Sequence, residues 1–156
     1  MTRVGTVLVL LVGAILLPAQ PSMAASCSGS SCSGLNPQTA GCSTGAVVKK
    51  EFSSDSLTLQ IRYSSTCRAW WARATTEGPD PTCALYVNII QLQQGQEAAR
   101  QRLVGQHAMP CDGGTSWTYM IGDLAQGDNY NACAIAGAWA VPRSPGESDG
   151  TCTGRF

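Results

Sequence analysis

The sequence carries little charge and no excess of either sign. Ten Lys and Arg residues balance ten Asp and Glu residues, charged residues make up 13% of the chain, and Lys49 and Lys50 are the only lysines. A phosphate-tracking groove or a polybasic membrane patch needs clustered Lys and Arg. We therefore expect no nucleic-acid partner and no electrostatic attachment to a membrane.

The sequence also lacks a convincing catalytic pattern. It has one histidine, His107, and no C-x-x-C pair, so the spacing of a zinc site is missing. Residues 41–45 match G-x-S-x-G around Ser43, and Asp80 and His107 follow in the chain order of an α/β-hydrolase. That motif needs a strand before its serine and a helix after it, whereas a polar loop precedes Ser43 and a strand pattern follows it. We expect a protein that is not an enzyme and has no catalytic residues, metal or cofactor.

A single long apolar run lies at the start of the chain. It extends from Val4 to Leu17, follows the basic residue Arg3, and is followed by small residues near position 24. It is shorter than the ~20 residues that span a bilayer, and the pattern is typical of a secretory signal peptide. We predict a signal peptide over residues 1–24, a secreted, extracellular protein, and no membrane span after cleavage. A retained anchor is less favoured because the apolar run is short for a membrane span. A lipoprotein acylated at Cys27 is less favoured because acylation would leave an odd number of cysteines.

Cysteine is the most informative residue type that is present. Eight cysteines in an oxidising compartment predict four disulfides, which can be connected in 105 ways. The cysteines are Cys27, Cys32, Cys42, Cys67, Cys83, Cys111, Cys133 and Cys152. We favour Cys133 with Cys152 and Cys83 with Cys111, because each pair would close the loop between neighbouring elements. Cys42 with Cys67 and Cys27 with Cys32 would then remain.

The hydrophobic pattern predicts a mainly β fold. Leu57, Leu59, Ile61 and Tyr63 alternate with Thr58, Gln60 and Arg62, which sends the first set to a core and the second to solvent. The other predicted strands are 46–52, 69–75, 84–92, 117–121 and 132–141, and we expect 96–104 to return as a hairpin rather than to form a helix. Residues 25–45 are rich in Gly, Ser and Cys. We predict one secreted domain over residues 25–156, a small disulfide-stapled β-sandwich or barrel with an irregular cysteine-rich N-terminal segment.

Aromatic residues provide the candidate binding surface. Trp70 and Trp71 are consecutive, so in a strand they point to opposite faces, and we expect Trp71 to be the buried one. The remaining aromatics could form an exposed stacking surface for sugars or for a protein: Trp70, Trp117, Tyr119, Tyr130 and Trp139. The simpler interpretation, that most of them fill the core, is favoured because large apolar side chains usually lie inside.

Two segments resemble a known family. One is C-S-G-S-S-C-S-G-L-N-P-Q-T-A-G-C, and the other is R-Y-S-S-T-C-R-A-W-W-A-R. They are similar to the YjfA-like group of small exported bacterial domains of unknown function, found in actinomycetes and bacilli. The matching positions are Cys27, Gly29, Cys32, Gly34, Pro37, Cys42, Arg62, Tyr63, Ser64, Cys67, Trp71 and Arg73. The resemblance implies export and β architecture but assigns no activity, and Cys83 and Cys111 are not part of the pattern.

The function favoured by the sequence is that of a non-catalytic binding or cell-envelope-associated module. Its partner would be an extracellular protein or a cell-wall glycan, and we expect a monomer. Two alternatives stay open. One is an inhibitor of extracellular proteases that inserts residues 142–151 as a rigid loop, and the weaker one is a small serine hydrolase that uses Ser43.

Overall fold

A computed structural model describes residues 24–78, 80–93, 96–106, 108–122, 129–136 and 151–152. The elements are η1 (Gly29–Cys32), β1 (Val47–Ser53), β2 (Leu57–Ser64), β3 (Ala69–Thr76), β4 (Asp80–Gln93), β5 (Gln96–Arg102), β6 (Met109–Cys111), β7 (Gly114–Trp117), β8 (Ile121–Gly122), β9 (Asn129–Ala136) and β10 (Thr151–Cys152). Within these ranges no helix is long and apolar enough to cross a bilayer. The expected signal peptide, apart from Ala24, lies outside the described residues, as do His107 and Trp139.

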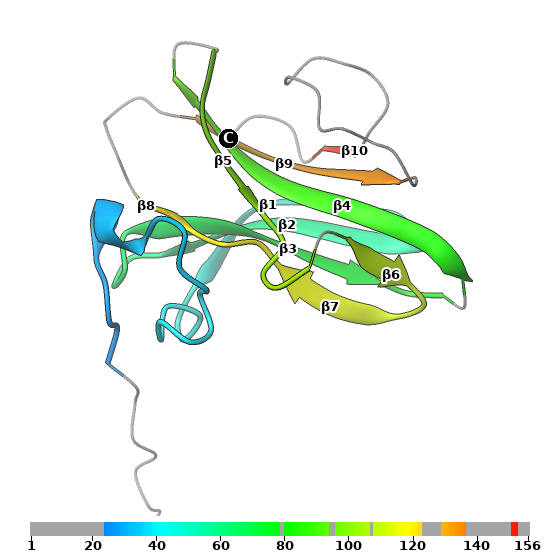
Figure 1. Ribbon diagram of the computed structural model, residues 1–156, viewed down its shortest axis with the longest axis horizontal. Helices are drawn as coiled ribbons and strands as arrows, with labels where there is room; N and C mark the ends of the chain where they lie inside the picture. The colour runs from blue at the N-terminus through cyan, green and yellow to red at the C-terminus, as the bar shows by residue number, and fades with distance from the viewer. Residues whose placement is uncertain are drawn as a thin grey trace, which may run out of the picture.

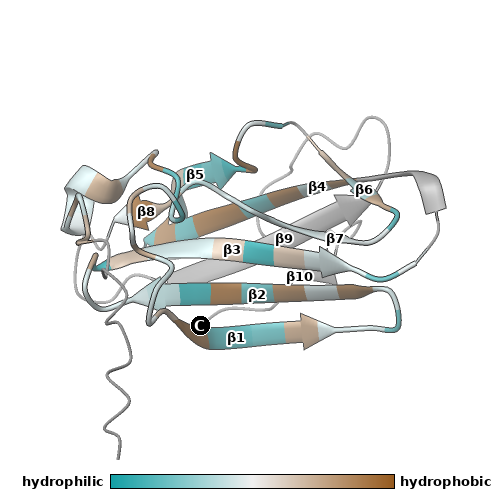
Figure 2. Ribbon diagram, turned by 90° about the horizontal axis from the view of Figure 1, so that it is seen from below, coloured by the Kyte–Doolittle hydropathy of each residue, from teal (hydrophilic) through white to brown (hydrophobic). Residues whose placement is uncertain are grey.

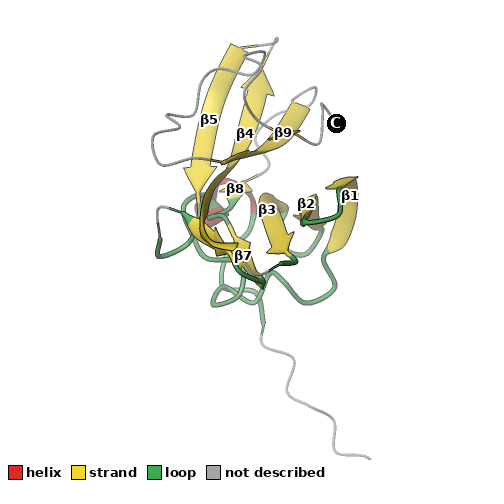
Figure 3. Cartoon of the chain, turned by 90° about the vertical axis from the view of Figure 1, so that its right-hand side faces the viewer, coloured by secondary structure: helices red, strands yellow, loops and turns green. Residues whose placement is uncertain are grey.

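The strands form two antiparallel sheets (Figure 1). The first sheet has the order β1-β2-β3-β7, and β8 also pairs with β3. The second has the order β10-β9-β4-β5, and β6 also pairs with β4. Figure 3 shows the two sheets as separate layers. The predicted mainly β class is therefore confirmed, and the two layers make it a sandwich.

The main core lies between the sheets. Leu59 and Ile61 of β2 contribute fully buried side chains from the first sheet, and they belong to one cluster with Val87 and Ile89 of β4. Leu57 and Tyr63 lie partly buried at the same cluster, as the period-two pattern predicts. Figure 2 shows the alternating hydropathy along β2. Each large buried side chain contributes about 1.5 to 3 kcal/mol, so this cluster stabilises the sandwich.

Both faces of the first sheet bury side chains, which corrects two expectations. Trp70 is buried between the sheets with its ring centroid 4.4 Å from that of Tyr63, so it is not part of an exposed surface. Trp71 is buried as predicted, but on the opposite face, against residues 25–46, which we call the cap. Gln60, which was expected to face solvent, is 8% exposed. The alternation indicates the two faces of a strand but does not show which neighbours bury the polar face, where the side chain of Gln60 donates to Glu51 of β1.

The predicted hairpin is confirmed, and one predicted strand is wrong. Strand β5 pairs with β4 from Gln93 and Gln96 onwards. The predicted strand 117–121 is divided between the end of β7 and the start of β8, because its central backbone donors bond to three different segments. Thr118 N–H donates to Ala72, Tyr119 N–H to Arg102, and Met120 N–H to Leu35. The expected strand 132–141 is seen as β9, and its residues 137–141 lie outside the described residues.

Candidate functional site

Two disulfides hold the cap. Cys27 is bonded to Cys32 and Cys42 to Cys67, as predicted. The first closes a loop of the cap on itself, and the second ties the cap to the turn between β2 and β3. The cap is poor in large apolar residues, so these crosslinks and its backbone bonds have to order it.

The other predicted disulfides are supported by strand register. Cys111 is disulfide-bonded, and β6 pairs with the part of β4 that contains position 83. Cys152 of β10 lies directly opposite Cys133 of β9. Cys83 with Cys111 and Cys133 with Cys152 thus stay as predicted pairs, with neighbouring backbones in both cases.

The cap docks on the sheet through backbone groups. Gly29 N–H donates to Cys67 O at 2.7 Å, and Gly34 N–H donates to Met120 O at 2.9 Å. A Cβ at Gly122 would lie 2.1 Å from the carbonyl oxygen of Gly29, so β8 and η1 touch through their backbones. This close approach requires glycine at 122.

Ser43 lies in a turn of the cap rather than in a nucleophile elbow. Its hydroxyl donates to Oε1 of Gln38 at 2.9 Å, and its N–H donates to the Pro37 carbonyl. The residues before it form turns, and β1 begins at Val47, so the strand-serine-helix context of a hydrolase is missing around Ser43. The side chain of Asp80 and residue His107 lie outside the described part of the chain.

The expected aromatic surface does not form as one patch. Trp70 lies in the core. Trp117 is half-buried, and its indole N–H donates to Oδ1 of Asn36 in the cap at 2.9 Å. Tyr119 is half-buried and lines a pocket, whereas the side chain of Tyr130 and residue Trp139 are outside the described residues. Tyr119 is therefore the predicted aromatic that the structure places at a candidate site.

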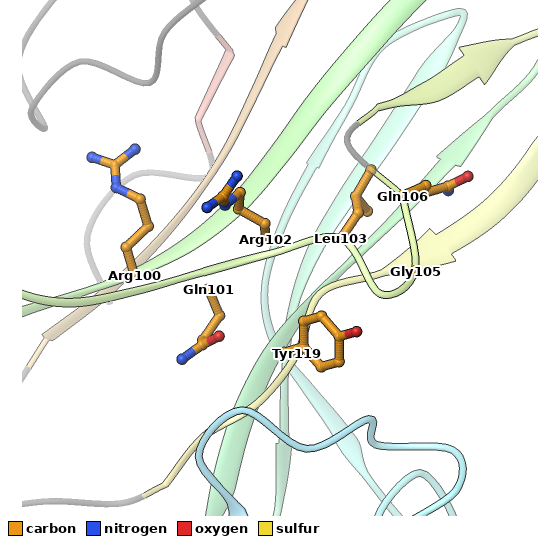
Figure 4. A pocket seen from close by; sticks show the side chains of 7 residues that line it. All are labelled: Arg100, Gln101, Arg102, Leu103, Gly105, Gln106 and Tyr119. Atoms are coloured by element: carbon orange, nitrogen blue, oxygen red, sulfur yellow. The ribbon is translucent and has the colours of Figure 1, made fainter.

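The pocket lies where β5 ends and meets the segment between β7 and β8. It has a volume of about 460 Å³ and is lined by Arg100, Gln101, Arg102, Leu103, Gly105, Gln106 and Tyr119 (Figure 4). Figure 4 shows Arg100 and Arg102 on one side of the β5 trace and Gln101 on the other, as strand geometry requires. The bond from Tyr119 N–H to Arg102 O fixes the two walls against each other.

The charge of the pocket is positive and only partly compensated. Arg100 makes a paired contact with Glu97, with Nε 2.9 Å from Oε1 and Nη2 2.5 Å from Oε2. The hydrogen bond from Arg100 lowers the pKa of Glu97, although burial acts in the opposite direction. Arg102 is exposed, and it adds a second guanidinium to the lining.

These side chains offer hydrogen-bond donors and acceptors to a ligand. The seven lining residues offer guanidinium donors, two amides and a phenol, and they include no serine, cysteine, histidine or carboxylate. A guanidinium binds carboxylate or phosphate through paired hydrogen bonds, and an amide can both donate to and accept from a hydroxyl.

Most of this pocket was missed from the sequence. Residues 96–104 were interpreted only as a hairpin, and no role was predicted for Arg100, Gln101 or Arg102. The R-Q-R triplet in a predicted strand does indicate two guanidiniums on one face. Their meeting with Tyr119 depends on long-range pairing, which the sequence pattern does not show.

The structure defines a class: a disulfide-crosslinked β-sandwich with an irregular N-terminal cap and a cationic surface pocket. A family model described as "Protein of unknown function (DUF2690)" matches residues 30–133. The chain belongs to this family. No curated protein and no solved structure matches the chain. The expected membership of a family of unknown function is thus confirmed, and the YjfA-like name stays a prediction.

Proposed function

We propose that the protein is an exported, non-catalytic binding module whose pocket at Tyr119 and Arg102 binds acidic cell-wall glycan. The observation that carries the proposal is the lining itself, in which Gln101 and Tyr119 lie on one side of β5 and the guanidiniums of Arg100 and Arg102 lie on the other (Figure 4). Its volume of about 460 Å³ falls in the ~300–1,000 Å³ range of small-ligand sites.

Each lining group has a counterpart on an acidic sugar. Arg102, on the other side of β5, would bind a carboxylate of the glycan chain through its planar guanidinium, which matches carboxylate geometry better than an ammonium does. The side-chain amides of Gln101 and Gln106 would exchange hydrogen bonds with sugar hydroxyls. The ring of Tyr119 would contact the apolar face of the sugar ring.

A cell-wall location agrees with the chemistry of the chain. Disulfides persist in oxidising compartments outside the cytoplasm, and the two cap disulfides are part of the fold. The expected signal peptide over residues 1–24 would deliver the protein there. The YjfA-like resemblance, which implies export, supports the same location.

The experiment is a pull-down that compares two insoluble glycans. Peptidoglycan carries carboxylates, whereas chitin is uncharged, so we expect retention on peptidoglycan and weak retention on chitin. Arg102→Gln should weaken retention about tenfold to a hundredfold, because one charge-assisted contact is lost. Lys50→Gln is the matched control, since it removes one positive charge from the exposed strand β1.

The comparison has clear adverse outcomes. Equal retention of Arg102→Gln and Lys50→Gln on peptidoglycan would show that the pocket does not bind the glycan. No retention on either glycan would end the proposal for glycans altogether.

A further inference from the structure

The sulfur atoms of the two cap disulfides form a single cluster. The Sγ atoms of Cys27, Cys32, Cys42 and Cys67 all lie within 4.8 Å of one another. Across the two bonds, Cys27 Sγ is 3.8 Å from Cys42 Sγ. Three stretches of chain converge here: the loop of η1, the turn before β1, and the turn between β2 and β3. The sequence contains no C-x-x-C, so only the fold reveals this quartet.

This arrangement is close to that of a tetrathiolate metal site. A Zn–S distance of ~2.3 Å with tetrahedral geometry separates the sulfurs by about 3.8 Å. Cys27 Sγ and Cys42 Sγ already have that separation, and the other sulfur pairs lie within 4.8 Å of one another. Once the disulfides are opened, rotation of the side chains can bring the four sulfurs to tetrahedral positions. The cysteine Cα atoms are 5.2 Å and 5.7 Å apart within each pair, so the backbones already hold the four ligands together.

The surroundings favour closed, structural coordination. Cys32, Cys42 and Cys67 are fully buried beneath Trp71 and Met120. Cys27 is partly exposed, which gives a reductant and an ion a way in. Four cysteine ligands fill a tetrahedral shell and leave no position for a water ligand, as in structural rather than catalytic zinc centres.

We propose that, when its two disulfides are reduced, the cap binds one Zn²⁺ through Cys27, Cys32, Cys42 and Cys67. A dithiol reductant supplies the electrons: each disulfide takes up two electrons and two protons to give two thiols, and each dithiol becomes a cyclic disulfide. The four thiols then release four protons as their thiolates bind the ion. The cap therefore has two closed states, one held by disulfides and one held by zinc.

The test uses the full chain, reduced with a dithiol under nitrogen and separated from the reductant. Zn²⁺ alone is added, the thiols are alkylated, and each cysteine is followed by peptide mass spectrometry. We expect Cys27, Cys32, Cys42 and Cys67 to react about tenfold more slowly with zinc than without it, because coordination holds the thiolate. The four cysteines outside this quartet serve as internal controls.

Substitutions and a spectroscopic probe sharpen the result. Co²⁺ in place of Zn²⁺ should give the intense visible bands of tetrahedral, sulfur-rich coordination, with one ion per cap. Cys32→Ser should lose that spectrum, and Cys111→Ser, which lies outside the quartet, should keep it. If zinc leaves the four cysteines of the quartet as reactive as the other four in the unsubstituted chain, the proposal is wrong, whether or not the variants fold.

Discussion

Removing the Cys42–Cys67 disulfide should destabilise the protein more than removing Cys27–Cys32. The perturbation is a pair of double substitutions, Cys42→Ala with Cys67→Ala, and Cys27→Ala with Cys32→Ala. Both variants lose one crosslink and two sulfur atoms, so they differ mainly in what each bond encloses. The first bond spans 25 residues of sequence, and the second spans 5.

The magnitude follows from the two loop lengths. In the chain-entropy treatment, a crosslink lowers the entropy of the unfolded chain by an amount that grows with the logarithm of loop length. This gives about 3.5 kcal/mol for Cys42–Cys67 and about 2 kcal/mol for Cys27–Cys32 at 25 °C. Burial acts in the same direction, because Cys42 and Cys67 are both fully buried whereas Cys27 is partly exposed.

The assay is urea unfolding followed by tryptophan fluorescence. Trp71 packs against the cap, so its emission reports the region that the bonds hold. The free energy of unfolding in water is obtained by linear extrapolation for the unsubstituted chain and both variants. We expect the two losses to differ by about 1.5 kcal/mol. A variant lacking Cys27–Cys32 that is as unstable as the one lacking Cys42–Cys67, or more so, would refute the loop argument.

Three further predictions concern single residues. Gly122→Ala should lower the free energy of unfolding by about 1 to 3 kcal/mol, since the new Cβ would overlap the η1 backbone. Chemical denaturation measures this loss, and an unchanged denaturation midpoint would contradict the close backbone approach of β8 and η1. Trp117→Phe should cost about 1 to 2 kcal/mol in the same assay because Asn36 loses its indole donor, and the same substitution should cost less in an Asn36→Ala background, where the indole has no acceptor to lose. Equal costs in the two backgrounds would count against the bond. Glu97 has a lowered pKa in the folded state, so its pairing with Arg100 stabilises the fold at pH values above the ordinary pKa of 4.5, and this stabilisation is lost as pH falls through the lowered pKa. Glu97→Gln should therefore reduce the fall in the free energy of unfolding over this acidic range, measured by denaturation at a series of pH values. The same fall in the variant would exclude the ion pair as the cause of the acid destabilisation.

The sequence predicted the elements whose signal is local. The alternation from Leu57 to Tyr63 is fixed by strand geometry, and the structure places both ends of this set at the core. The two cap disulfides were also predicted, because the other cysteines are better placed to close loops among the later strands. The mainly β class followed from several short apolar segments between turn residues.

The sequence could not indicate the features that depend on which distant segment packs against each strand. Trp70 and Trp71 were correctly assigned to opposite faces, but both faces of β3 are covered, so the exposed position expected for Trp70 does not exist. The predicted strand 117–121 is interrupted after Trp117 because the backbone N–H groups of Thr118, Tyr119 and Met120 donate to different segments. The cationic pocket and the cysteine quartet arise in the same way, from segments brought together by long-range pairing.

The central claim is that a specific pair of disulfides orders the cap on the sheet. The most direct measurement is a non-reducing peptide map after pepsin digestion at acidic pH, where thiol exchange is slow because the thiolate is protonated. Leu35 is 41% exposed and lies between Cys32 and Cys42, so cleavage beside it separates the two disulfides. The account predicts one peptide closed by Cys27–Cys32, separate from a fragment that joins Cys42 to Cys67. A map in which either Cys27 or Cys32 stays joined to Cys42 or Cys67, or in which these four cysteines are free thiols, would contradict it.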